Sequence, residues 1–246
     1  MRGHATGRRL LMLSPLGAVL LASLVVLTGH AQTSSRYNPL RAAYMRAHFH
    51  QALLLHDAVA RGDIARARAE AATLAGISPN VPMPAGATAF QGALTQAARE
   101  AAAAASLEDA ARATATLFGT CGQCHKANHI RAAVPAASDS QVGGLVGHML
   151  LHQKGLDNLL EGLVAPSDAQ WVEGVRIFAS PKFDPHGMPG KTRKAIEYGE
   201  TELAVLAGHA APAERTRDRV DIYARVIATC GNCHRTHGKF AGPNRH

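Results

Sequence analysis

The sequence predicts an all-α fold built as two tandem four-helix bundles. Aromatic residues make up only 4% of the 246 residues, which disfavours a β-sandwich. Alanine, the residue with the highest helix propensity, is abundant, as in the stretch AAREAAAAAS. The peptide TCGQCHK at 120–126 returns as TCGNCHR at 229–235, and the apolar residues before each copy recur with helical spacing. The chain therefore contains an internal repeat of helical units.

Residues 1–31 have the features of an export signal. Three arginines precede a 19-residue apolar run from Leu10 to Thr28, and Gly29-His30-Ala31 resembles a small-x-small cleavage site. We expect export to the periplasm with removal of this segment, and an uncleaved membrane anchor is the alternative. The rest of the chain keeps 23 Lys and Arg against 18 Asp and Glu, a net charge of +5. No basic cluster is interleaved with aromatic residues, so we expect no nucleic-acid partner.

The first unit is predicted to span residues 36–135. Its first helix has an apolar stripe that includes one histidine, formed by positions 45, 48, 52, 55 and 59. Two further helices, at about 63–75 and 88–105, are separated by GISPNVPMPAG, whose prolines and glycines break a helix. The final helix begins at the capping pair Ser106-x-x-Asp109 and leads into the first cysteine motif.

The second unit is predicted to span residues 139–246, and the join lies within 132–141. At an offset of 100 its first helix carries the equivalent stripe, formed by positions 145, 148, 152, 155 or 156, and 159. Helices follow at about 167–179 and 191–207, separated by SPKFDPHGMPG, and Pro212 suits the first turn of the last helix. Four amphipathic helices with mostly short links in each unit describe a four-helix bundle.

The two cysteine motifs have the Cys-x-x-Cys-His spacing that is typical of covalent haem attachment. In this chemistry the thiols form thioethers to the haem and the histidine binds its iron. The predicted tethers of two haem c groups are Cys121, Cys124, Cys230 and Cys233, and the predicted proximal ligands are His125 and His234. A Cys₄ zinc site and two disulfides are the alternatives, but neither requires the histidine after each pair. A thioredoxin-like redox pair would need a βαβ context, which the sequence lacks.

A haem motif at the C-terminal end of a four-helix bundle, with the first helix facing the far side of the iron, resembles the cytochrome c prime class. The resemblance implies a duplicated dihaem cytochrome. That class leaves the sixth iron position open or crowds it with an apolar residue, and its low-spin relatives place a methionine there. This sequence departs from both patterns by offering His48 and His148 at equivalent positions. Met45 is a weaker candidate in the first unit, and Met149 or His152 could compete in the second.

Two irons that both carry histidine on each side would have no vacancy for substrate. We therefore expect an electron carrier and not an enzyme, with redox proteins as partners, including membrane-bound donors or acceptors. The alternative is a gas-binding or sensing protein in which one haem stays five-coordinate and takes NO or CO. A dihaem peroxidase would need an open iron and positioned acid-base groups, and the sequence shows no such constellation.

Overall fold

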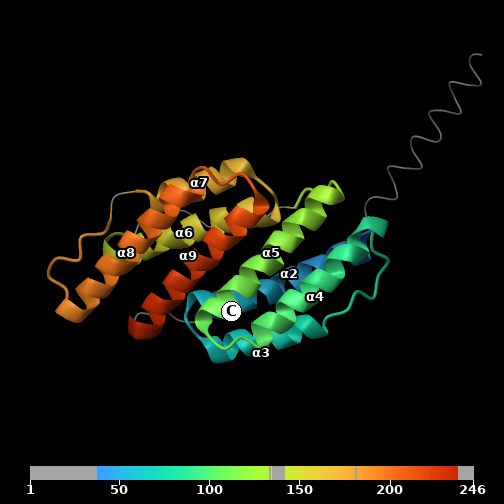
Figure 1. Ribbon diagram of the computed structural model, residues 1–246, viewed down its shortest axis with the longest axis horizontal. Helices are drawn as coiled ribbons and strands as arrows, with labels where there is room; N and C mark the ends of the chain where they lie inside the picture. The colour runs from blue at the N-terminus through green and yellow to red at the C-terminus, as the bar shows by residue number, and fades with distance from the viewer. Residues whose placement is uncertain (1–37, 133, 135–141, 181, 238–246) are drawn as a thin grey trace, which may run out of the picture. The chain divides into compact units, whose positions relative to one another are not determined.

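The computed structural model describes residues 38–132, 134, 142–180 and 182–237. Within these ranges the protein is all-α, with eight α-helices, one short 3-10 helix and no strand (Figure 1). None of the described helices combines the length and apolar character needed to cross a membrane. The proposed export signal at 1–31 and most of the proposed join at 132–141 lie outside the described residues. The described residues from Tyr44 onward belong to one compact unit.

The helix bounds agree closely with those predicted from the sequence. The first half contains α2 (Pro39–Ala60), α3 (Ile64–Gly76), the 3-10 turn η1 (Ala85–Ala87), α4 (Thr88–Ala102) and α5 (Leu107–Ala127). The second half contains α6 (Gly144–Val164), α7 (Asp168–Phe178), α8 (Gly190–Ala210) and α9 (Thr216–His237). In each half a long irregular connection separates the second helix from the third, where the proline- and glycine-rich segments predict it.

Local capping explains where several helices begin. Ser106 caps α5 by accepting a hydrogen bond from the Asp109 amide at 3.1 Å, as the sequence predicts. Asp63 caps α3 in the same way, from the Arg66 amide at 3.0 Å. One expectation is wrong: Pro212 lies in the turn before α9, which begins at Thr216. The chain needs these extra residues to turn from the end of α8 into the last helix.

The first half packs largely through alanine. Helix α4 contacts both α3 and α5, and five alanines at these contacts are almost fully buried: Ala67, Ala71, Ala97, Ala98 and Ala101. Small side chains let helix axes approach closely. Helix α2 joins this group through the Phe49 ring, which meets the Phe118 ring of α5 edge-on at 6.4 Å. It also joins through a 2.7 Å hydrogen bond from Gln51 to the carboxylate of Glu70 on α3.

The second half packs around a single tryptophan. Helix α7 lies between α6 and α8, and α9 contacts α6 and α8. Trp171 of α7 is buried, and its indole N–H donates to the Ala210 carbonyl at 3.1 Å. Gly162 of α6 leaves the space that this tryptophan fills, because a Cβ there would press against the Trp171 backbone and Cβ.

The two halves meet where α5 packs against α9 (Figure 1). The stripe of residues that precedes each cysteine motif makes this contact: the Phe118 and Tyr223 rings lie edge to face at 6.4 Å. His56 of α2 completes the contact, since its Nε2 is 2.9 Å from the Tyr223 hydroxyl and both side chains are buried. The apolar stripe that precedes each motif is therefore buried, as the sequence predicts. It packs against the stripe of the other half.

Candidate haem sites

Both Cys-x-x-Cys-His motifs lie within helix, near the ends of α5 and α9. Residues three and four positions apart share a helix face, so each motif presents two thiols and one imidazole to the same side. Burial, followed by the neighbouring thiol Cys124, raises the pKa of Cys121 to about 12. Burial and Cys233 raise the pKa of Cys230 to the same value. A thioredoxin-like redox pair would require a lowered thiol pKa, so these thiols do not suit that role.

The alternatives to haem attachment can be compared with this geometry. All four cysteines are free thiols in the structure, so neither pair forms a disulfide. Among the described residues, one group of three His, Cys, Asp or Glu side chains brings its ligand atoms close enough to share a metal ion, and it contains no cysteine. The four thiols therefore do not converge on a Cys₄ site.

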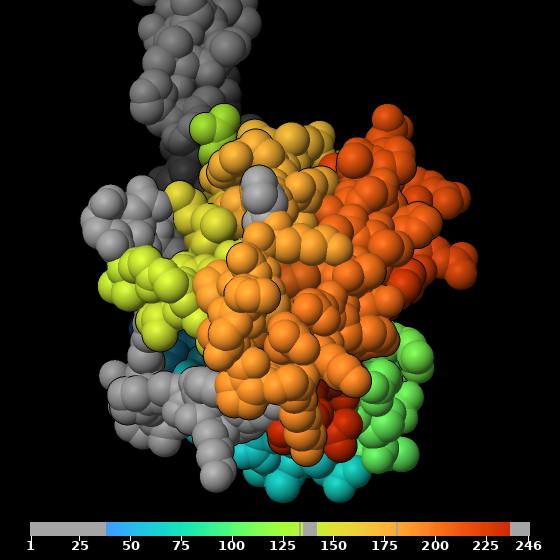
Figure 2. Space-filling model, turned by 90° about the vertical axis from the view of Figure 1, so that its left-hand side faces the viewer, coloured from blue at the N-terminus to red at the C-terminus, as the bar shows by residue number. Residues whose placement is uncertain are grey.

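Each histidine predicted to be a proximal ligand is oriented by a hydrogen bond to the opposite half. His125 Nδ1 donates to the Val164 carbonyl at 2.7 Å, and His234 Nδ1 donates to the Ala60 carbonyl at 2.8 Å. These carbonyls belong to the last residues of α6 and α2, where a helix leaves its carbonyls without partners. A proton on Nδ1 leaves Nε2 of a neutral imidazole free to bind a metal. In Figure 2 the end of α9, in red, lies between α8, in orange, and the first half, in teal and green.

The glycine that follows the first cysteine of each motif allows the two halves to approach closely enough for these hydrogen bonds. A Cβ on Gly122 would overlap the Leu163 carbonyl oxygen at the end of α6. A Cβ on Gly231 would overlap the Val59 carbonyl oxygen at the end of α2. The sequence shows that both motifs read Cys-Gly-x-Cys-His, and the structure supplies the reason: only glycine lets the other half come so close.

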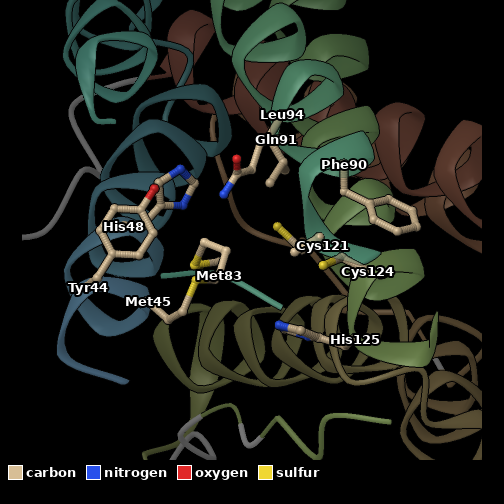
Figure 3. Close-up of a pocket in the computed structure, with 11 residues that line it drawn as sticks. Tyr44, Met45, His48, Met83, Phe90, Gln91, Leu94, Cys121, Cys124 and His125 are labelled. Atoms are coloured by element: carbon tan, nitrogen blue, oxygen red, sulfur yellow. The ribbon is translucent and has the colours of Figure 1, made fainter. Parts of the chain in front are cut away.

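The first motif opens on a pocket that also contains His48 (Figure 3). The space among these residues measures about 390 Å³, a figure that includes open solvent. Helix α2 contributes His48 and Tyr44, α5 contributes the motif, and α4 with the preceding segment contributes the remaining wall. The full lining is Tyr44, Met45, His48, Met83, Ala87, Phe90, Gln91, Leu94, Cys121, Cys124 and His125. The structure thus brings together every site residue predicted for the first unit.

Two side chains of the pocket, His48 and Gln91, have a polar atom without a hydrogen-bond partner among the described residues, and of these the Gln91 Nε2 is fully buried. The His48 residue is 8% exposed, burial lowers its pKa, and its ring has no hydrogen-bond partner among the described residues. It is therefore a neutral imidazole with a nitrogen available for coordination. The Gln91 Nε2 is buried and also lacks a partner. The mostly apolar lining, with one imidazole and one unpaired donor, suits an apolar group that carries acceptor atoms, which is the chemical character of haem.

Met83 is a pocket residue that the sequence reasoning missed, because it lies in the segment treated only as a helix breaker. Its thioether and that of Met45 both face the pocket between the motif and α2 (Figure 3). A signal was available: Met83-Pro84 precedes the third helix of the first half, and Met188-Pro189 precedes that of the second.

In the second half His148 has a hydrogen-bond partner, whereas His48 in the first half has none among the described residues. The His148 Nε2 is 2.6 Å from an Oε1 of Glu200 on α8, and the His152 Nε2 is 3.5 Å from the same oxygen. Burial, then His148 and His234, lowers the pKa of His152 to about 4. Burial, then the Glu200 carboxylate, raises the pKa of Cys233. This His148–His152–Glu200 cluster therefore lies beside the second motif, and the sequence reasoning did not foresee its carboxylate.

No known protein family model matches the chain, and neither do curated proteins or solved structures at a significant level.

Proposed function

We propose that the protein is a dihaem c-type cytochrome that transfers single electrons between redox partners in the periplasm. It would be a duplicated four-helix bundle similar to the cytochrome c prime class, with one haem c in each half. One observation carries the proposal: a Cys-x-x-Cys-His motif opens on a mostly apolar pocket that also contains His48, a largely buried histidine whose ring has no hydrogen-bond partner among the described residues. The second copy of the motif, with the equivalent His148, extends the proposal to both halves.

Each chemical role has a named residue. Cys121 and Cys124 would tether the first haem, and Cys230 and Cys233 the second. His125 and His234 would bind the irons through Nε2, since Nδ1 of each donates to a backbone carbonyl. His48 and His148 would occupy the sixth positions. Bound haem would supply one-electron chemistry between ferric and ferrous iron.

The surrounding protein would favour electron transfer over the binding of a substrate. Phe90 and Leu94 would give the haem apolar neighbours, and two imidazole ligands would lower the reduction potential below that of a Met/His pair. The hydrogen bonds from Nδ1 to fixed helix ends keep the proximal rings in one orientation. An iron with histidine on both sides has no site for substrate, so the partners would be redox proteins, including membrane-bound donors or acceptors, and not small molecules.

Electron paramagnetic resonance of the oxidised protein, together with a count of covalent haem, tests the proposal. We expect two haems per chain, both low-spin. The His48→Ala variant should convert one haem to the high-spin form, whereas His50→Ala, an exposed histidine on the same helix, should leave both unchanged. Fewer than two covalent haems would refute the dihaem assignment, and a low-spin spectrum that survives His48→Ala would refute the sixth ligand.

Gas binding is the second candidate, and the unpaired Gln91 Nε2 is the observation that favours it. A buried amide that lacks a partner could donate a hydrogen bond to NO or CO on an open iron. A carbon monoxide titration of the reduced protein separates the two functions. Saturation at micromolar gas with a shifted Soret band would favour gas binding, whereas an unchanged spectrum would favour electron transfer.

A further inference from the structure

Two histidines and one glutamate of the second half bring their ligand atoms together. His148 and His152 lie one turn apart on α6 and share a face of that helix, and Glu200 reaches them from α8. Each of the three residues offers one ligand atom that lies within 4.8 Å of the other two. Among the described residues this is the one group of His, Cys, Asp and Glu side chains that converges in this way.

The spacing of the ligand atoms suits a tetrahedral metal ion. Zinc binds imidazole nitrogen and carboxylate oxygen at about 2.0–2.2 Å, so neighbouring ligand atoms of a tetrahedral site lie roughly 3.3 Å apart. The Glu200 Oε1 is 2.6 Å from the His148 Nε2 and 3.5 Å from the His152 Nε2, and these two values bracket that spacing. Side-chain shifts of less than about 1 Å would therefore admit the ion.

The surroundings of the cluster favour a cation. Glu200 is 7% exposed, and both of its ion-pair contacts in the described part of the chain are to histidines. A buried carboxylate is costly without a compensating positive charge, which a divalent ion would supply. The rings of Phe183 and Phe178 pack against His148 and His152 at 5.4 and 5.5 Å, so the two imidazoles are already held in place.

The first half has no counterpart of this cluster. At the offset of 100 that relates the first helices, Ala52 stands where the second half has His152. Counting 30 residues back from the first cysteine of each motif reaches Gln91 in the first half and Glu200 in the second. The first half thus lacks both the second imidazole and the carboxylate, and the chain offers one such site and not two.

We propose that the His148–His152–Glu200 cluster binds one divalent transition-metal ion, of the class represented by Zn²⁺. Two imidazoles and one carboxylate would hold the ion, and water would take the fourth position. Imidazole ligands favour zinc and its transition-metal neighbours over Mg²⁺ and Ca²⁺, which prefer oxygen. The inference goes beyond the proposed function, which assigns His148 to the second iron. One Nε2 atom cannot bind two metals, so the zinc-loaded chain would leave the second iron without His148.

Equilibrium dialysis of the full protein against Zn²⁺, after treatment with a chelator, tests this inference. Mass spectrometry of the metal should count one zinc per chain. His152→Ala and Glu200→Gln should each weaken zinc binding at least about tenfold, the loss that follows removal of even a second-shell partner. X-ray absorption at the zinc edge should show nitrogen and oxygen ligands at about 2.0–2.2 Å and no sulfur at about 2.3 Å.

The matched controls are His186→Ala and Glu197→Gln, which remove the same groups from exposed positions of the same half and should leave zinc affinity unchanged. Circular dichroism shows that each variant is folded, and if Glu200→Gln does not fold, His152→Ala still decides. Zinc held equally well by His152→Ala, or zinc with sulfur ligands, would overturn the inference. Two covalent haems without bound zinc would refute this inference alone, whereas bound zinc with a missing haem would refute the proposed function alone.

Discussion

Replacing Gly122 by alanine should loosen the contact that orients His125, the histidine of the first motif. The new Cβ would overlap the Leu163 carbonyl oxygen and lie 3.5 Å from the Pro166 ring. The obstacle is backbone, which cannot rotate aside as a side chain can, so α5 and the end of α6 must separate. The separation would break the bond between His125 Nδ1 and the Val164 carbonyl, because Val164 follows Leu163 directly.

The expected cost is about 1–3 kcal/mol, the usual range for overpacking a well-packed contact. For a protein of this size that cost lowers the melting temperature by roughly 2–12 °C. Thermal unfolding followed by circular dichroism measures it on the haem-loaded protein. Gly92→Ala is the control, since a Cβ at that exposed helical position meets nothing within 4 Å and should stabilise the helix by about 0.5–1 kcal/mol. If Gly122→Ala stabilises the protein as Gly92→Ala does, the close contact described between α5 and the end of α6 is wrong.

Two further substitutions test other parts of the structure. Tyr223→Phe removes the buried hydroxyl that bonds to His56 and should cost about 1–3 kcal/mol in a chemical denaturation curve; a cost no greater than that of Tyr198→Phe, at an exposed tyrosine, would contradict the described contact between the halves. Met83→Leu keeps the volume of the pocket wall but removes a thioether, and the first haem should stay low-spin; conversion to high spin would show that Met83, and not His48, is the sixth ligand.

Local signals explain why most of the helices were predictable. The cap at Ser106 and the proline-rich breaks each act over a few residues, and such short-range effects are visible in the chain itself. The prediction failed where local signals conflict or are missing. The third helix was expected to reach residue 105 but ends at Ala102, because an alanine run contains no stop signal and the next helix needs room for its cap.

The contacts that complete the candidate haem sites join residues far apart in the chain. His125 contacts Val164, His234 contacts Ala60 and Glu200 contacts His148. The spacing of apolar residues along the sequence does not predict such pairs. The paired Met-Pro dipeptides at Met83 and Met188 were visible in the sequence, but their meaning depends on a pocket that only folding creates.

By itself, the sequence determined the all-helical architecture, the internal repeat and the two Cys-x-x-Cys-His motifs, since each depends on the order of neighbouring residues. The tertiary structure alone decided that the histidine of each motif donates to a backbone carbonyl of the other half, that the repeated glycine is a close-contact residue, and that the buried acid Glu200 contacts His148. These features arise because helix packing sets distances between backbone carbonyls, imidazoles and carboxylates, and such distances are a property of three-dimensional contact and not of spacing along the chain.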